Sequence, residues 1–476
     1  MALTGRSVFN RPTPAMSTST LRHNLRHCTY DGIAATPIVY LLQPGNFIIA
    51  ALLVEMFQLP PATYGLIASL PFWGNFAQAF LMPLVNRSYS PKAVSVASSS
   101  LQALCWAIMA VMLSFLPIDQ PQISGRWFIT LFAVSAAVTA LTGVSWMSWV
   151  QEWVPVRLRG KYFGRRNRLL QVAQILFLVL SGWLIGELSG SIVAFQVVLG
   201  SAVVLRVASV LLQRKIHAEI PVNDRAETRI PWRDQVRALL ETKPFLWLVS
   251  YGAAWGFAAS TFGPFYAIFM YKQLGFSVQN VSTLVILSSV GGAVSAPAWG
   301  ALADRFGNKP VMLFCMIAWQ VQNLLWCVLT PENSWLLYGM WSYGGVMGAG
   351  FVLSLFNLQL KIIPPHAKTL AISANLAITS LITAMGPIVG GEILQHLLQG
   401  NSSPIEVYHQ VFLVLPVMAL LACLLLTRVH ERASSPLSSV VGAMRNIRTL
   451  GGVFGLSILV DYVFIKPSPS AKKQKL

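Results

Sequence analysis

Twelve stretches of mainly apolar residues, each about as long as a membrane-crossing helix, constrain this chain more than any other feature. Roughly 20 such residues are needed because the hydrocarbon layer is about 30 Å thick and a helix rises about 1.5 Å per residue. The stretches cover residues 31–56, 63–85, 93–117, 127–151, 168–188 and 191–212, then 245–270, 278–302, 310–329, 335–359, 369–397 and 405–427. We therefore predict an all-α membrane protein with twelve transmembrane helices in two six-helix halves.

One long polar connection separates the two sets of six and sets the domain organisation. We expect an N-terminal tail at 1–30, a first half at 31–212, a linker at 213–243, a second half at 244–430 and a C-terminal tail at 431–476. In the linker, "PWRDQVRALLE" places apolar residues on one helical stripe after a proline and predicts a short helix on the membrane surface. In the C-terminal tail, "PLSSVVGAMRNIRTL" predicts an interfacial amphipathic helix.

The charges favour a membrane protein of defined orientation. Only 11% of the residues are charged, against about 25% in soluble proteins, which argues against a soluble enzyme. Of the 34 Lys and Arg residues, 31 lie on the side of the termini and the linker, and only Arg126 and Lys272 lie in loops on the other side. Because cytoplasmic loops retain positive charge, we expect both termini in the cytoplasm and the chain in the bacterial inner (plasma) membrane. The net charge of +18 then indicates attraction to anionic lipid and no nucleic-acid partner.

Sequence motifs for cofactor chemistry are not found. The five cysteines are scattered without a CxxC pair, and there is no phosphate loop, dinucleotide fingerprint, zinc-ligand spacing or nucleophile motif. We therefore expect no metal, no cofactor and no enzymatic activity, in a chain that acts as a monomer.

Loop sequences repeat between the two halves. The second stretch is followed by "MPLVNRSYSPK" and the eighth by "GALADRFGNKP", which matches Asn86 with Asp304 and Arg87 with Arg305. Repeated six-helix units are a known plan of membrane transporters. With "GALADRFGNK" and the basic loop "RLRGKYFGRR", the chain resembles the major facilitator superfamily over about residues 31–430. The first-half loop departs from the family pattern because Asn86 replaces the acid.

The resemblance implies a gate at the cytoplasmic ends of the helices. Asp304 would face the start of the fifth span near Asn167, while Arg305, Gly307 and Lys309 complete the loop. A carboxylate facing a helix N-terminus is stabilised by about 0.3–1 kcal/mol, more when partly buried. The alternative is that this loop only ends the eighth span. Arg87 and Glu152 would form a second latch in the first half.

The resemblance also implies that spans 1, 4, 7 and 10 line a substrate cavity. The candidate lining residues are Tyr40, Gln43, Asn46, Thr142, Trp146, Trp149, Trp255, Thr261, Tyr266, Trp341 and Tyr343. These amide, hydroxyl and aromatic groups suit a small neutral or amphipathic solute, and the alternative for each tryptophan is packing between helices. Ionisable residues such as Asp31, Glu55 and Arg206 are expected near the membrane surfaces, with Arg206 extending toward the cytoplasm.

Two functions follow from these observations. The first is a secondary or facilitative transporter working by rocker-switch alternating access, with a coupling proton or cation left open. The second is a non-transporting membrane protein on the same fold, such as a lipid-handling protein or a sensor. A polar pocket between the halves favours the first, and a cleft open sideways to lipid favours the second.

Overall fold

The computed structural model describes residues 17–88, 90–188, 190–217, 232–363, 368–431 and 434–446, together with 449, 451 and 453. Within these ranges, the side chains of residues 79, 82–88, 152, 156, 232 and 368–369 are not described. The described residues form helices and connecting turns, without strands.

The first half contains seven α-helices and one π-helical segment. They are α1 (Thr18–Leu41), α2 (Phe47–Ala50), η1 (Ala51–Met56), α3 (Pro61–Ser88), α4 (Pro91–Met112), α5 (Pro121–Trp153), α6 (Val156–Glu187) and α7 (Ile192–Arg214). Prolines begin α4 and α5, where a missing N–H costs nothing, and the Ser191 hydroxyl accepts a hydrogen bond from the third residue of α7. Local sequence therefore places these helix starts.

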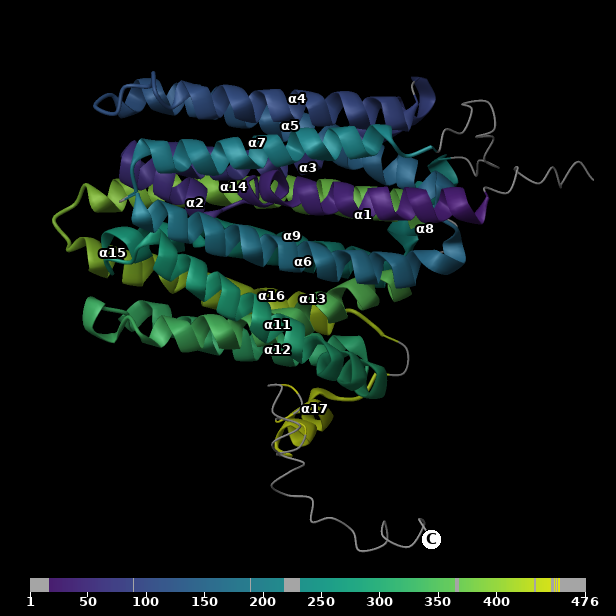
Figure 1. The fold of residues 1–476 in the computed structure, drawn as a ribbon. Coiled ribbons are helices and arrows are strands. Elements are labelled where there is room, and N and C mark those ends of the chain that lie inside the picture. Colours follow the sequence, from purple (N-terminus) through teal and green to yellow (C-terminus); the bar gives the residue numbers. More distant parts are fainter. Residues whose placement is uncertain are drawn as a thin grey trace, which may run out of the picture.

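The linker helix and the second half follow. They are α8 (Trp232–Glu241), α9 (Lys243–Phe262), α10 (Phe265–Lys272), α11 (Val278–Phe306), α12 (Asn308–Asn323), the short 3₁₀ segments η3 (Leu324–Val328) and η4 (Pro331–Asn333), α13 (Leu336–Ile362), α14 (Lys368–Leu398), α15 (Pro404–Phe412), α16 (Val414–Thr427) and α17 (Leu437–Met444). Figure 1 shows the long helices side by side, with most of the first half above most of the second.

Nine helices of the described residues are long and apolar enough to cross a membrane. The expected spans at 31–56, 63–85 and 245–270 are not among them; they correspond to α1 with α2 and η1, to α3, and to α9 with α10. Two of these three are interrupted. The chain turns at 42–46, where the Asn46 carboxamide oxygen accepts hydrogen bonds from Ile48 and Ile49 N–H, and it bends again at Gly263–Pro264.

The two halves meet mainly through two helix pairs, each with one helix from each half: α3 with α14 and α6 with α11. The green α14 accordingly lies among first-half helices in Figure 1. Glycines let the backbones approach: a Cβ on Gly65 would collide with the Pro387 carbonyl oxygen, and one on Gly182 would lie 3.0 Å from the Ser282 Cβ. Larger residues at these positions would push the halves apart.

Hydrogen bonds between the halves lie at the end of the molecule opposite the linker. The Tyr64 hydroxyl donates to the Pro264 carbonyl at 3.2 Å, and the Tyr271 hydroxyl donates to the Phe47 carbonyl at 3.0 Å. The Ala62 N–H donates to the Gln395 side-chain oxygen at 3.2 Å. We call this the closed end.

Two short helices lie at the linker end. In α8, Leu239 is buried against Phe245 and Val249 of α9. In α17, Val440 and Met444 are buried, and the helix packs on α12. Part of the apolar face expected to enter the membrane interface is thus covered by protein.

Candidate functional site

A cavity of about 1080 Å³ lies between α6 of the first half and helices of the second half. Its polar and aromatic lining side chains are Arg168, Gln171 and Gln174 of α6, Trp255 of α9, Tyr266 of α10, Ser288 and Ser289 of α11, Trp319, Gln322 and Asn323 of α12, Trp326 of η3, and Trp341 of α13. Glycines of α13 and alanines of α11 form much of the remaining wall. The volume is enough for a drug-sized organic molecule, since such pockets measure about 300–1,000 Å³.

The part of the cavity nearest the closed end is aromatic. Tyr266 follows the Pro264 contact by two residues, and its ring stacks on Trp326 with 4.2 Å between the ring centres. Trp255 and Trp319 lie further along the wall, with 6.0 Å between ring centres. Such rings offer flat apolar faces to a ligand.

The opposite part of the wall is polar and basic. Arg168, Gln171 and Gln174 follow one another at intervals of three residues on α6, so they share one side of that helix. Arg168 is exposed and lies toward the linker end of α6. The cavity is therefore basic at the end nearer the linker, and the stacked rings lie at its other end, beside Gln322 and Asn323.

A second, smaller space of about 310 Å³ separates α3 from α9, α13 and α14. Its lining includes Asn75 of α3, Gln359 of α13 and Asn375 of α14. The last two lie near the linker ends of their helices. The halves are thus in contact at the closed end and separated by space toward the linker end.

Three of the residues predicted for the cavity line it, namely Trp255, Tyr266 and Trp341. Tyr343, Thr261 and the candidates of the first half are not among its lining residues. The structure gives several of them other roles: Tyr40 and Trp149 are buried in packing, Asn46 caps α2, and the hydroxyls of Thr142 and Thr261 donate to carbonyls of their own helices. Gln43 is exposed in the turn between α1 and α2.

Sequence reasoning missed the contribution of α6. Its cavity face was detectable, because Arg168, Gln171 and Gln174 recur at helical spacing within an otherwise apolar stretch. Trp319 and Trp326 were missed as well, and nothing in their local sequence separates a lining tryptophan from a packed one.

A buried polar network crosses the first half. Asp31 is 2% exposed, and its carboxylate accepts hydrogen bonds from Ser209 at 2.6 Å, Gln213 at 3.0 Å and Trp146 at 3.1 Å. Arg206 donates to the hydroxyls of Ser99 at 2.9 Å and Ser209 at 3.0 Å.

This network corrects the expectation that Arg206 extends toward the cytoplasmic surface, whereas Asp31 lies beside Gln213, near the end of α7. Arg206 is only 3% exposed and points into the bundle, because hydroxyl groups of α4 and α7 supply acceptors there. Trp146, predicted for the cavity, donates to Asp31 instead, and the Arg166 guanidinium lies 4.6 Å from its ring centre.

The predicted gate loop connects α11 to α12. Asp304 and Arg305 are exposed, and Asp304 has no hydrogen-bond or ion-pair partner among the described residues. Gly307 has φ +97°, a conformation that favours glycine. The structure does not describe the side chains of Arg87 and Glu152, which were predicted to form the second latch.

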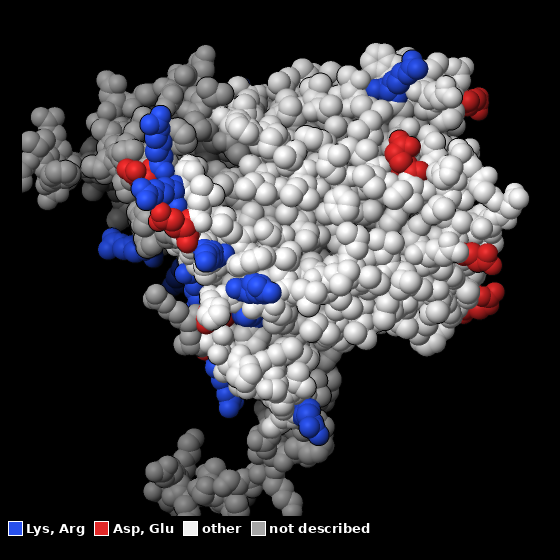
Figure 2. Space-filling model, turned by 180° about the vertical axis from the view of Figure 1, so that it is seen from behind, with Lys and Arg blue, Asp and Glu red and all other residues white. Residues whose placement is uncertain are grey.

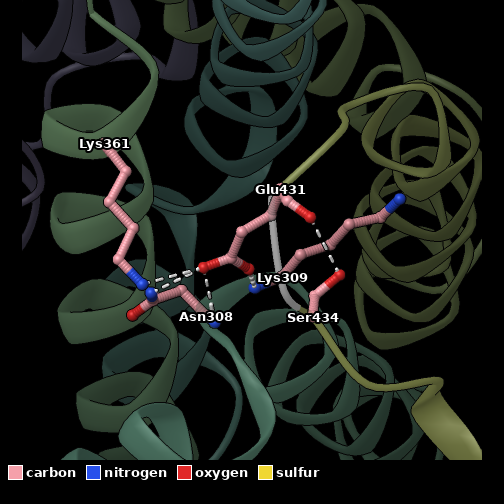
Figure 3. Close-up of polar contacts among 5 residues, drawn as sticks. All are labelled: Asn308, Lys309, Lys361, Glu431 and Ser434. Atoms are coloured by element: carbon pink, nitrogen blue, oxygen red, sulfur yellow. Dashed lines mark hydrogen bonds and ion pairs between the residues drawn. The ribbon is translucent and has the colours of Figure 1, made fainter.

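Glu431, which sequence reasoning did not single out, holds the start of α12 (Figure 3). Its carboxylate accepts hydrogen bonds from Asn308 N–H at 3.1 Å, the Asn308 side-chain amide at 2.9 Å and Lys309 N–H at 2.8 Å, and it pairs with Lys361 Nζ at 3.1 Å. Burial alone would raise the pKa of Glu431, but these donors together lower it below its ordinary value. Lys309 Nζ in turn donates to the carbonyls of Thr427 and Val429.

Comparison with known proteins identifies the family. The model of the Major Facilitator Superfamily matches residues 38–266 and 252–465. A multi-drug resistance efflux pump of Streptococcus pneumoniae is 27% identical over 172 residues, which are 35% of this chain and 40% of the pump. The chain thus matches less than half the length of this relative.

Solved structures share the fold. A D-xylose–proton symporter superposes with a TM-score of 0.65 at 12% identity, covering 88% of this chain and 100% of the symporter. A bacterial homolog of the human lysosomal transporter Spinster, in an inward-facing and unoccupied conformation, gives 0.58 at 16% identity, with 96% and 100% covered. Because its family model matches both halves, the chain belongs to the major facilitator superfamily.

Proposed function

We propose that this protein is a secondary or facilitative transporter that moves a small neutral or amphipathic solute across the membrane by rocker-switch alternating access. The observation that carries the proposal is the contrast between the two ends: hydrogen bonds join the halves at the closed end, whereas the smaller space and the Arg168 end of the cavity separate them toward the linker end. The relative in S. pneumoniae is described as an efflux pump, which supports a transport function.

The distribution of charge supports an orientation. Figure 2 shows Lys and Arg side chains gathered at one end and mostly acidic side chains at the other. By the positive-inside rule, the basic end, with the linker, faces the cytoplasm. We place the protein in the bacterial inner membrane as a monomer with both termini inside, so that the described conformation is inward-facing.

The gate belongs to the same proposal. In the inward-facing state Asp304 has no partner among the described residues, and Asn167 at the start of α6 is exposed. Closing the cytoplasmic end would bring the two together. Asp304→Asn is then expected to weaken the outward-facing state by about 1 kcal/mol, a shift of about fivefold in population. Asn86→Ala is the control, since a neutral side chain at this position loses no charge interaction.

Distance measurements between spin labels test the switching. One pair, Lys161→Cys with His430→Cys, spans the linker end, and the other, Asp119→Cys with Trp335→Cys, spans the closed end; all four residues are exposed. Each pair of labels should show two populated distances. The state with the longer distance at one end should be the state with the shorter distance at the other end. A single unchanging distance at both ends, with and without solutes, would favour the alternative, a non-transporting protein that handles lipid or senses a ligand.

A further inference from the structure

The cavity wall carries an unbalanced charge. Among its lining residues, all of which the structure describes, Arg168 is the only one with a formal charge, and no carboxylate is present. Arg168 also takes part in no ion pair or hydrogen bond with another described residue. A guanidinium that faces a cavity without an acidic partner can accept the negative group of a ligand, because it offers several N–H donors in a fixed plane.

The surroundings of Arg168 extend its positive potential. Arg165 and Lys161, one and two turns away on α6, are exposed at the same end of the helix. Gln171 and Gln174 continue the polar side of α6 into the cavity, and each carboxamide supplies further donors. A positively charged solute would be repelled at this end of the cavity, because the cavity lining contains no carboxylate to offset the positive charge.

The end of the cavity opposite Arg168 favours an uncharged group of the ligand. From Arg168 to Ile175, the last residue of α6 that lines the cavity, α6 rises by about 10 Å at about 1.5 Å per residue. Beyond that residue the wall carries the rings of Tyr266, Trp326 and Trp341, with the side chains of Gln322 and Asn323 beside them. A ligand that satisfies both ends has an apolar, preferably aromatic, body and one terminal polar group.

We infer that the cavity binds an amphipathic organic anion, with its carboxylate, sulfonate or phosphate at Arg168 and its apolar body against the aromatic wall. This inference rests on the proposed function and narrows its substrate class from neutral or amphipathic solutes to those with one negative charge. Arg168 acts as the specificity-determining residue, and Gln171 and Gln174 orient the same group.

A matched set of ligands tests the inference. Full-length protein in phosphatidylcholine nanodiscs is dialysed to equilibrium against naphthylacetate, naphthylacetamide or naphthylethylammonium, with protein-free nanodiscs correcting for partition into lipid. The three probes share an aromatic body and differ in charge. The carboxylate should bind about tenfold more tightly than the amide, and the ammonium should bind most weakly.

Variants locate the selectivity. Arg168→Gln should abolish the preference for the carboxylate over the amide, and Arg168→Lys should restore part of that preference. Arg165→Gln removes the same charge from a neighbouring residue that does not line the cavity, and it should keep most of the preference. Trp326→Leu should weaken the binding of all three probes alike.

Two results would overturn the inference. The first is equal or tighter binding of the amide or the ammonium to the unaltered protein. The second is an equal loss of the preference for the carboxylate in Arg165→Gln and Arg168→Gln. That result would show that the preference comes from the combined positive charge of the basic end. Spin-label distances that alternate without anion preference would leave the transport proposal standing alone, whereas anion preference with static distances would refute transport and keep the binding site.

Discussion

Replacing Glu431 by glutamine should loosen the C-terminal helix α17 from the rest of the protein. The Glu431 side chain is 2% exposed and joins the segment after α16 to the first residues of α12 and to Lys361 of α13. Ser435, on the same segment, donates its N–H to the Phe306 carbonyl at 2.8 Å, and α17 begins two residues later. The carboxylate thus anchors the segment from which α17 extends.

The expected cost follows from the individual contacts. A glutamine oxygen can keep the hydrogen bonds from Asn308, but its NH₂ group would face the Lys309 N–H and leave that donor without an acceptor. A hydrogen bond to a charged group contributes about 1.5–3 kcal/mol, and the loss of negative charge at the helix N-terminus adds about 0.3–1 kcal/mol. The pair with Lys361, whose side chain is 55% exposed, adds little. The total of about 2–4 kcal/mol corresponds to opening of the segment that is roughly 30- to 700-fold more frequent.

Hydrogen–deuterium exchange of the α17 amides measures this opening directly. Glu241→Gln is the matched control, because it removes the same charge from an exposed pair with Arg237 in α8. Exchange in residues 437–444 should accelerate only in the Glu431 variant. Unchanged exchange there, or equal acceleration in both variants, would show that α17 is held by its own packing on α12.

Three further changes have defined outcomes. Because the folded-state pKa of Glu431 lies below its ordinary 4.5, its stabilisation is complete above that pH and is lost as the pH falls through the folded-state value. The protection of the α17 amides relative to their intrinsic exchange rates should therefore fall on acidification, and Glu431→Gln should remove this dependence. Asp31→Asn replaces one acceptor oxygen by an NH₂ group that faces a buried donor, and it should lower the free energy of unfolding by about 2–4 kcal/mol, whereas the exposed Glu55→Gln should change it little; equal effects would contradict the network. Gly65→Ala should lengthen the spin-label distance at the closed end, and Gly200→Ala, which points a methyl group into open space, should leave it unchanged.

The pattern of apolar residues was informative about the fold because each membrane span must be apolar over its own length, which is a local property. Interruptions were harder to predict. The turn at 42–46 depends on Asn46 reaching the N–H groups of Ile48 and Ile49, and a proline-containing stretch can also continue as a kinked helix, as α14 does through Pro387.

The site depended on contacts between residues far apart in the sequence. From the sequence of its own helix, Arg206 is expected to extend to the surface. The side chain instead turns inward, because Ser99 on α4 offers it a hydrogen-bond acceptor. Glu431 looks like an ordinary tail residue until α12 is placed beside it. The aromatic candidates Trp255, Tyr266 and Trp341 came from the family resemblance, which places spans 7 and 10 at the cavity. The polar spacing of α6 was visible in the sequence, but that this side faces the second half follows from the packing of α6 on α11.

The network around Asp31 and Arg206 also bears on how the chain is made. Ser99, Trp146, Ser209 and Gln213, which bind these two charged groups, all precede the linker in the sequence. A nascent chain therefore carries every one of these partners once α7 has left the ribosome. Since unpartnered charges are costly in lipid, the early pairing favours assembly of the first six spans before the second six are synthesised. The later spans then insert beside a bundle that has already withdrawn its charged groups from the lipid.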